Sequence, residues 1–361
     1  AKQGVTQAMI KTELIRIYDP DGDAEGVLRA GDILRHGGLV AIPTETVYGL
    51  AANAFDETAV RAVYAAKGRP SDNPMIVHIA EFDALAELVT QVPPAAGILA
   101  EHFWPGPLTM VLPRSEKVPL TTTGGLSTVA VRMPGNPIAR AIIRAAGVPL
   151  AAPSANRSGS PSPTTFRHCV DDLWDSVDAI VESEDCTVGV ESTVVSFLPD
   201  GTPQILRPGA VTPEEIRRFC GDVAIADAVL HMLPSDAAAP SPGMKYKHYA
   251  PAATLTLLCG SRQDYADRVN EYYETLRRTG EEDGFYAMCF DEDVSLLEAP
   301  TISYGVAYDY ASQAQNLFDV LRQLDNLQAT EAYVHAPEPE EMGLAVYNRL
   351  LRAAAFRVVS L

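Results

Sequence analysis

The sequence predicts an α/β protein with a second, smaller α/β domain behind the first. Over the first two thirds of the chain, short runs rich in β-branched residues alternate with amphipathic helical segments. The same alternation resumes after residue 252, beyond a stretch dominated by Ala, Pro, Ser and Gly. A chain of 361 residues is long enough for two domains with separate cores. We therefore expect one domain over residues 1–220, a linker over 221–251 and a second domain over 252–361.

The first block reads as a sheet with helices around it. A helix is expected over 56–67, with Asp56 at its N-cap, and another from Pro213 to about Cys220. The second helix begins with a capping box, in which Thr212 is the N-cap and Glu215 lies three residues later. Strands are expected over 39–43, 75–79, 108–112, 128–133, 178–182 and 192–197.

The second block reads as a small open parallel sheet, because strands and helices alternate one by one. Strands are expected over 254–259, 285–290 and 331–336, and helices over 263–278, 310–325 and 340–356. Neither GxGxxG nor GxxxxGK[ST] occurs in it, so no dinucleotide or P-loop site is predicted there. The linker up to residue 240 is expected to be a semi-rigid, mostly extended tether.

Composition excludes several classes of protein. The formal net charge of −19, from 47 acidic and 28 basic side chains, argues against a protein that mainly coats a nucleic-acid backbone. Without an apolar stretch of about 18 residues or a signal-peptide pattern, the chain is expected to be cytoplasmic and free of the membrane. The five cysteines lack a CxxC pair and are expected to be reduced packing residues; they are Cys169, Cys186, Cys220, Cys259 and Cys289.

Two cations follow the first helix. Lys67 and Arg69 precede a stiff polar loop that includes Asn73, and we expect both to lie outside the core and to face an anion. The alternative is ordinary charge complementation at a helix C-terminus. Because the other cations of the first block include Arg132 and Arg207 at strand ends, the pattern favours a concave positive site for a nucleotide.

Polar residues mark further strand ends. Thr46 follows an apolar strand in a segment that fits a capped turn equally well, and His78 is more often a core histidine than a ligand. Arg132 shares a strand face with Thr128 and needs a carboxylate or phosphate partner, from the protein or from a ligand.

The segment "PLAAPSANRSGSPSP" (149–163) ends an apolar run in a loop whose backbone amides could hold phosphate. Ser154 and Asn156 would point the same way in an extended chain, although a plain surface loop has the same composition. No GxSxG, HExxH or paired cysteine ligands occur, which leaves serine and zinc hydrolase chemistry without support. Arg, Lys, Ser and Asn suit nucleotidyl transfer around ATP and Mg²⁺.

Eight ordered segments closely resemble the Sua5 branch of the YrdC/Sua5 family, the threonylcarbamoyl-AMP synthases. They are "IPTETVYGLAANAF", "KGRPSDNPMIVHI", "FWPGPLTMVL", "TVAVRMP", "APSANRSGSPSPT", "GVESTVVSF", "ILRPGAV" and "SPGMKYKHYAP". The resemblance implies a YrdC-like twisted sheet with a concave positive cavity and a small Rossmann-like Sua5 domain. It also implies synthesis of threonylcarbamoyl-AMP from L-threonine, bicarbonate and ATP, with release of pyrophosphate.

The resemblance also implies roles for single residues. The family's Lys, Arg, Ser, Asn tetrad corresponds to Lys67, Arg69, Ser154 and Asn156. We expect the L-threonine contacts at Thr46, His78, Arg132, Ala152 and Ser192. The ATP contacts are expected at Arg69, Asn73, Thr128, Ser154, Ser162, Arg207, Tyr246, His248 and Tyr249. Mg²⁺ would accompany ATP, and its ligands are not assigned.

The segment 241–251 is expected to be a lid over the nucleotide, because two tyrosines, a histidine and two lysines are rich chemistry for a spacer. The product would pass to a tRNA threonylcarbamoyl transferase that modifies tRNAs reading ANN codons, with weak or indirect contact between this chain and tRNA. Two alternatives remain open at this point: an RNA-binding module without adenylation activity, and a carbamoyl transferase that uses carbamoyl phosphate.

Overall fold

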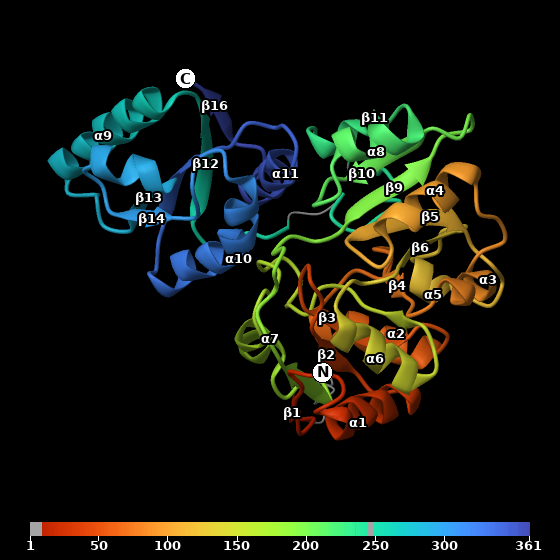
Figure 1. Ribbon diagram of the computed structural model, residues 1–361. Helices are drawn as coiled ribbons and strands as arrows, with labels where there is room; N and C mark the ends of the chain where they lie inside the picture. Colours follow the sequence, from red (N-terminus) through yellow and green to blue (C-terminus); the bar gives the residue numbers. More distant parts are fainter. Residues whose placement is uncertain (1–8, 235, 245–247) are drawn as a thin grey trace.

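The computed structural model describes residues 9–234, 236–244 and 248–361, which form two α/β blocks (Figure 1). The first block has a mixed sheet in the order β1-β8-β2-β3-β7-β4-β6-β5-β9-β10-β11. Its strands are β1 Glu13–Arg16, β2 Val40–Ile42, β3 Gly49–Asn53, β4 Ile76–His78, β5 Leu108–Pro113, β6 Thr128–Arg132, β7 Leu150–Ala151, β8 Ala179–Glu182, β9 Thr193–Phe197, β10 Pro203–Arg207 and β11 Ala224–Ile225.

Helices cover this sheet over its two largest cores. One core contains residues of α1 and α6, and the larger one contains residues of α2, α4, α7 and α8. The helices are α1 Ala24–Arg35, α2 Glu57–Lys67, α3 Leu85–Leu88, α4 Pro94–Phe103, α5 Leu120–Thr123, α6 Pro137–Ala146, α7 Phe166–Leu173 and α8 Pro213–Cys220, with a 3-10 turn η1 at Phe82–Ala84.

The predicted strands and helices of this block are confirmed. The side-chain caps expected at the start of two helices are also present. The Asp56 carboxylate accepts hydrogen bonds from the N–H groups of Thr58 and Ala59 and so caps α2. The capping box of Thr212 and Glu215 is present at the start of α8. Along β6, Val129 and Val131 point into the main core, as the period of two requires.

The second block is a parallel sheet in the order β14-β13-β15-β12-β16, which confirms the small open sheet. Its strands are β12 Thr254–Cys259, β13 Phe285–Cys289, β14 Thr301–Ser303, β15 Glu331–His335 and β16 Val358–Ser360. Its helices are α9 Arg262–Thr279, α10 Tyr310–Asn326 and α11 Gly343–Ala353, with a 3-10 helix η3 at Asp291–Leu296. The sequence did not predict β14 and β16, because three residues are too few for a periodic pattern.

The expectation of an extended tether over 221–240 is wrong in its first part. The strand β11 pairs in parallel with β10, and a 3-10 turn, η2 at Asp227–Val229, follows it. Ala228 and Val229 are buried. This part of the chain therefore belongs to the first sheet, whereas the predicted domain boundaries stay a prediction. In the parts of the chain that the structure describes, no helix has the length and apolar character needed to cross a membrane.

The two blocks are packed against each other. Figure 1 shows α10 and α11 on the side of the second block that faces the first. Val47 and Val190 of the first block belong to the core cluster of the second, and Leu344 of α11 belongs to the main core of the first. Arg322 of α10 forms an ion pair with Asp172 of α7, with 2.9 Å between Nη1 and Oδ1. The contact is therefore both apolar and charged.

Candidate active site

A cavity lies where three strands of the large sheet end. His78, Arg132 and Arg207 are the last residues of β4, β6 and β10, and Ser192 immediately precedes β9. The parallel pairing of β4 with β6 sets His78 opposite Arg132. The antiparallel pairing of β9 with β10 brings the start of one strand to the end of the other. Sheet pairing thus collects side chains that lie far apart in the sequence.

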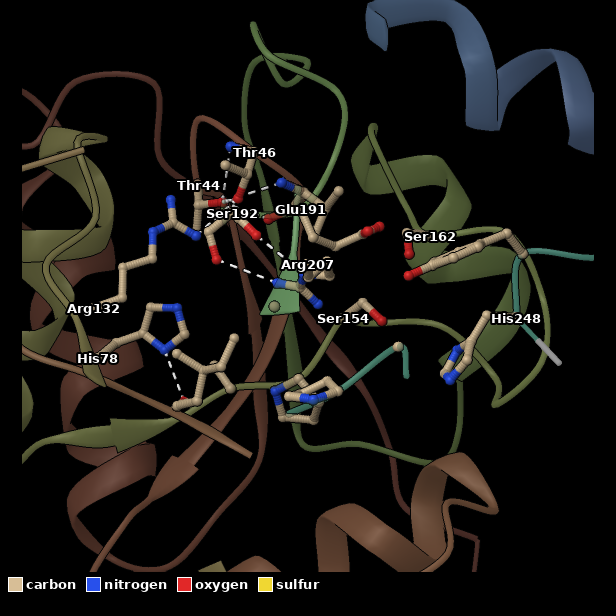
Figure 2. A pocket seen from close by; sticks show the side chains of 18 of the residues that line it. Thr44, Thr46, His78, Arg132, Ser154, Ser162, Glu191, Ser192, Arg207 and His248 are labelled. Atoms are coloured by element: carbon tan, nitrogen blue, oxygen red, sulfur yellow. Dashed lines mark hydrogen bonds between the residues drawn. The ribbon is translucent and has the colours of Figure 1, made fainter. Parts of the chain in front are cut away.

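Most of the predicted contact residues line this cavity. Those that do are Thr46, Arg69, His78, Arg132, Ala152, Ser154, Ser162, Ser192, Arg207, His248 and Tyr249. In Figure 2, Arg132 and His78 lie at one end, Ser154, Ser162 and His248 at the other, and Arg207 between them. The cavity therefore has two ends with different donors.

Arg132 has protein partners at every guanidinium nitrogen. Its Nη1 donates to Thr46 Oγ1 at 2.8 Å, its Nε donates to Gly106 O at 3.2 Å, and its Nη2 contacts the Glu45 carboxylate. Glu45 is thus the carboxylate that the sequence required, and it comes from the protein. Because a guanidinium carries five N–H groups, two of them remain for a ligand. Burial lowers the pKa of Arg132, and Glu45 opposes that effect.

His78 is both a core residue and a cavity residue. Its ring is 4% exposed, and Nδ1 lies 3.0 Å from the carbonyl oxygen of Ile76. Burial, together with the nearby Arg132, lowers the pKa of His78 to about 3. The imidazole is therefore neutral near pH 7. With Nδ1–H donating to Ile76 O, its Nε2 can accept a hydrogen bond, and the ring adds no positive charge beside Arg132.

Arg207 and Arg69 are buried cations aimed at the same space. Arg207 donates from Nε to Ser192 O at 3.0 Å and from Nη2 to Ser192 Oγ at 3.2 Å. Arg69 donates from Nη2 to Pro74 O at 2.7 Å. Burial lowers the pKa of each guanidinium to about 10, so both remain charged at neutral pH. Cations held away from water attract an anion more strongly than exposed ones.

Lys67 has a different place from the one expected. The prediction that it lies outside the core is wrong, since its side chain is only 2% exposed, and it is not among the residues that line the cavity. Its Nζ donates to the carbonyl oxygens of Ser154 and, at 2.6 Å, Asn156. Arg69, which is 9% exposed, is buried against the same expectation. Lys67 thus fixes the 154–156 loop from behind.

Three other predicted residues also lie off the cavity wall. Asn156 donates from Nδ2 to Arg157 O at 2.8 Å and to Ser160 O at 3.0 Å, so it does not point alongside Ser154. Asn73 and Thr128 are not lining residues. The predicted Tyr246 lies outside the described residues. The Asn156 side chain bonds to the backbone of its own loop. The chain is therefore not extended here, and Ser154 and Asn156 do not share a face.

Sequence reasoning missed the role of Glu191, the residue before Ser192. It is 7% exposed and lines the cavity, and its Oε2 accepts from Arg349 Nε of α11 at 2.9 Å. Burial acts to raise the pKa of Glu191, but Arg349 and Arg207 lower it below its ordinary value, so the side chain stays a carboxylate. No motif in the sequence signals a pair 158 residues apart.

The end of the linker reaches the cavity, as the lid expectation requires. His248 and Tyr249 line it, and Tyr249 packs on Phe318 of α10 with ring centroids 5.1 Å apart. Gly243 has a φ of +81°, and a Cβ there would meet the Tyr249 hydroxyl at 3.0 Å and Arg207 Cδ at 3.4 Å. A glycine therefore lets the linker approach Arg207 closely. The opening and closing of this segment stay a prediction.

The expectation that the cysteines are reduced agrees with the structure. All five cysteines are free thiols, and Cys169, Cys186 and Cys289 are buried. His168, beside Cys169, faces Asp319 of α10, with 2.9 Å between Nε2 and Oδ1. Among the described residues there is no cluster of three or more His, Cys, Asp or Glu side chains that could hold a metal ion.

Fold and site together define an α/β protein whose large sheet carries a buried cationic cavity, lined in part by the end of the linker. Two family models match the chain: the Sua5, YciO and YrdC model described as "Telomere recombination" over residues 32–209, and the "Threonylcarbamoyl-AMP synthase, C-terminal domain" over 211–355. The chain belongs to the threonylcarbamoyl-AMP synthase family.

The similarity to individual relatives extends over nearly the whole chain. The threonylcarbamoyl-AMP synthase of Pyrococcus abyssi is 42% identical over 91% of this chain and 94% of its own length. The Bacillus subtilis enzyme of the same name is 40% identical over 92% and 94%. The crystal structure of P. abyssi Sua5 with L-threonine superposes with a TM-score of 0.88 and covers 97% of this chain and all of that one, at 40% identity.

Proposed function

We propose that this chain condenses L-threonine, bicarbonate and ATP into threonylcarbamoyl-AMP and releases pyrophosphate. The observation that carries the proposal is the cavity itself, which places the buried guanidiniums of Arg69, Arg132 and Arg207 around one space. Three buried cations suit a substrate set that includes a triphosphate and an amino-acid carboxylate. The family's name and the threonine complex of a relative support the same chemistry.

The two ends of the cavity suggest where each substrate binds. Threonine would place its carboxylate on the two free N–H groups of Arg132 and its polar groups near Thr46, His78 and Ser192. The nucleotide would lie toward Ser154, Ser162 and His248, with Arg207 beside the phosphates. This division agrees with the layout of Figure 2 and stays a proposal.

The reaction needs no covalent bond to the protein. The threonine amine attacks the carbon of bicarbonate, water leaves, and a carbamate forms. A carbamate oxygen then attacks the α-phosphate, and the bond to the β-phosphate oxygen breaks, so that pyrophosphate carries away the electron pair. Arg69 and Arg207 would offset the charge that develops on the phosphates. Lys67 contributes by fixing the 154–156 loop rather than by contact with the phosphates.

Mg²⁺ is proposed to accompany ATP, and one observation fits it. Glu191 Oε1 is buried and has no hydrogen-bond partner among the described residues, and Glu191 lines the cavity. A carboxylate oxygen with the remaining ligands from phosphate and water is a common Mg²⁺ arrangement. When bound, Mg²⁺ would neutralise charge on the triphosphate. Glu191 would hold the ion directly or through water.

The product is proposed to pass to a tRNA threonylcarbamoyl transferase in the cytoplasm, with weak or indirect tRNA contact. The acidic chain, with a net charge of −19, speaks against strong binding of tRNA by this protein alone. A pyrophosphate-release assay beside a tRNA gel shift separates synthesis from the RNA-binding alternative. Threonine-dependent pyrophosphate with weak tRNA binding is expected; tight, salt-sensitive tRNA binding without pyrophosphate would overturn the proposal. Turnover with carbamoyl phosphate and no threonine would favour the carbamoyl transferase alternative.

A further inference from the structure

A second cavity, of about 190 Å³, lies in the second block at the carboxyl ends of β12, β13 and β15. The strands β12 and β15 are neighbours, but the chain leaves β12 toward β13 on one side and leaves β15 toward β16 on the other. Ligands of open parallel sheets bind at such a point. The volume is below the roughly 300–1,000 Å³ of pockets for drug-sized ligands, which favours a small metabolite.

The floor of this cavity holds two buried oxygen acceptors without donors. Asp293 is 1% exposed; its Oδ2 accepts from Phe290 N at 2.9 Å and lies 2.7 Å from His335 Nδ1. Its Oδ1 has no hydrogen-bond donor among the described residues. The fully buried Gln313 donates from Nε2 to Val306 O, and its Oε1 also lacks a donor. A buried acceptor without a donor destabilises the fold unless a ligand supplies an N–H or O–H.

A positive group stands directly beside these acceptors. The guanidinium of Arg262, whose side chain is half exposed, has its Nε 3.8 Å from Asp293 Oδ1, too long for a hydrogen bond. Arg262 is also the first residue of α9, and the N-cap Ser261 lines the cavity as well, so the positive end of the helix dipole lies beside the site. The buried Asp293 carboxylate and the Arg262 guanidinium therefore lie side by side as a long ion pair.

We propose that this cavity binds a small zwitterion of the α-amino-acid class. Its ammonium would donate to Asp293 Oδ1 and Gln313 Oε1, and its carboxylate would bind Arg262 and the start of α9. In an α-amino acid the ammonium and the carboxylate are bonded to the same carbon and therefore lie close together. The groups that would bind them, Asp293 and Arg262, are also close, with 3.8 Å between Oδ1 and Nε. The rings of Phe290, Tyr308 and Tyr310 line the walls and suit an ammonium or an apolar side chain.

A phosphate-rich ligand fits this cavity less well. Glu338 lines it together with Asp293, so two carboxylates and one arginine surround the space, unlike the first cavity with its three arginines. The same helix serves both sites, since α10 carries Gln313 in the second cavity and, five residues later, Phe318 against Tyr249 of the linker.

The test is calorimetric titration of the full chain with each of the proteinogenic L-amino acids. For at least one of them, Arg262→Gln and Asp293→Asn should each weaken binding tenfold or more. Arg262→Gln changes a half-exposed side chain, so it keeps the test valid if Asp293→Asn folds poorly. The matched control is Arg268→Gln, which makes the same change at an exposed position of α9 and should leave binding unchanged.

Two further probes examine the zwitterion itself. The decarboxylated amine and the N-acetyl derivative of the bound amino acid should each lose most of the affinity, because each lacks one charge. The proposal is overturned if no amino acid binds, or if every one that binds does so equally to all the variants. It is also overturned if inorganic phosphate binds, loses affinity in Arg262→Gln and keeps it in Asp293→Asn.

Discussion

At the scale of single residues, Lys67 departs most from its sequence interpretation. The side chain precedes a polar loop and would ordinarily be exposed, yet its Nζ is buried against the carbonyl oxygens of Ser154 and Asn156. Burial lowers the pKa of Lys67 well below its ordinary value. Its Nζ therefore supports a loop that carries a cavity residue, whereas its catalytic role stays a prediction.

Lys67→Ala should for this reason destabilise the protein as well as slow synthesis. Each carbonyl that loses its buried donor costs about 1–3 kcal/mol. Urea unfolding followed by circular dichroism measures the loss, with Arg61→Ala as the control, because Arg61 is an exposed cation on the same helix. If the two variants were equally stable, the supporting role of Lys67 would be refuted.

The burial of His78 makes the stability of the protein depend on pH. The pKa of His78 is lowered from 6.5 to about 3, mainly by burial, so the unfolded chain binds this proton more readily than the folded one. The free energy of unfolding should therefore fall as pH drops from about 6.5 toward 3, by at most about 1.4 kcal/mol per pH unit for this residue. Urea midpoints of wild type and His78→Gln across that range measure the effect. A wild-type slope no steeper than the variant's would contradict it.

At the scale of elements, α11 holds the two blocks together through buried charge. Arg349 is fully buried; besides its bond to Glu191 Oε2, it donates from Nη2 to Glu191 O at 3.0 Å and contacts Pro208 O. Arg352 donates from Nη1 to Met244 O at 2.9 Å. The C-terminal helix thus contacts both the carboxylate that lines the first cavity and Met244, which lies within the segment 241–251.

Arg349→Met should be strongly destabilising, by about 3–5 kcal/mol, because it leaves the Glu191 carboxylate buried without its closest cation. Combining it with Glu191→Gln should recover part of the loss, since the amide carries no charge. A double-mutant cycle by urea unfolding measures this coupling. Additive effects of the two changes would show that the pair is not coupled.

Sequence patterns predicted the elements that have strong local signals. The cap at Asp56, the capping box at Thr212 and the alternation along β6 all depend on neighbours within a few residues, and each is present. Sequence patterns did not predict ion pairs between residues that are far apart in the sequence. The pairs of Arg132 with Glu45 and of Arg349 with Glu191 join segments that only the tertiary fold brings together. Glu45 lay in a quoted motif, but nothing local showed which cation it would face.

At the scale of the whole molecule, contacts with the second block stabilise the first block. A fragment 1–225 would lack Arg349 and expose Val47 and Val190 to water. We expect this fragment to be less stable than the full chain and to lose pyrophosphate release. Urea unfolding of both proteins measures this. A fragment as stable as the full chain would show that the contact between the blocks contributes little.

Synthesis of threonylcarbamoyl-AMP in the first cavity can be followed by isotope labelling. The full chain is incubated with ATP, L-threonine and ¹³C-bicarbonate, and the products are followed by mass spectrometry. We expect a threonylcarbamoyl adenylate that carries the bicarbonate carbon and forms in step with pyrophosphate, and no such product when threonine is omitted. Pyrophosphate release without threonine, or an adenylate that lacks the labelled carbon, would contradict this expectation.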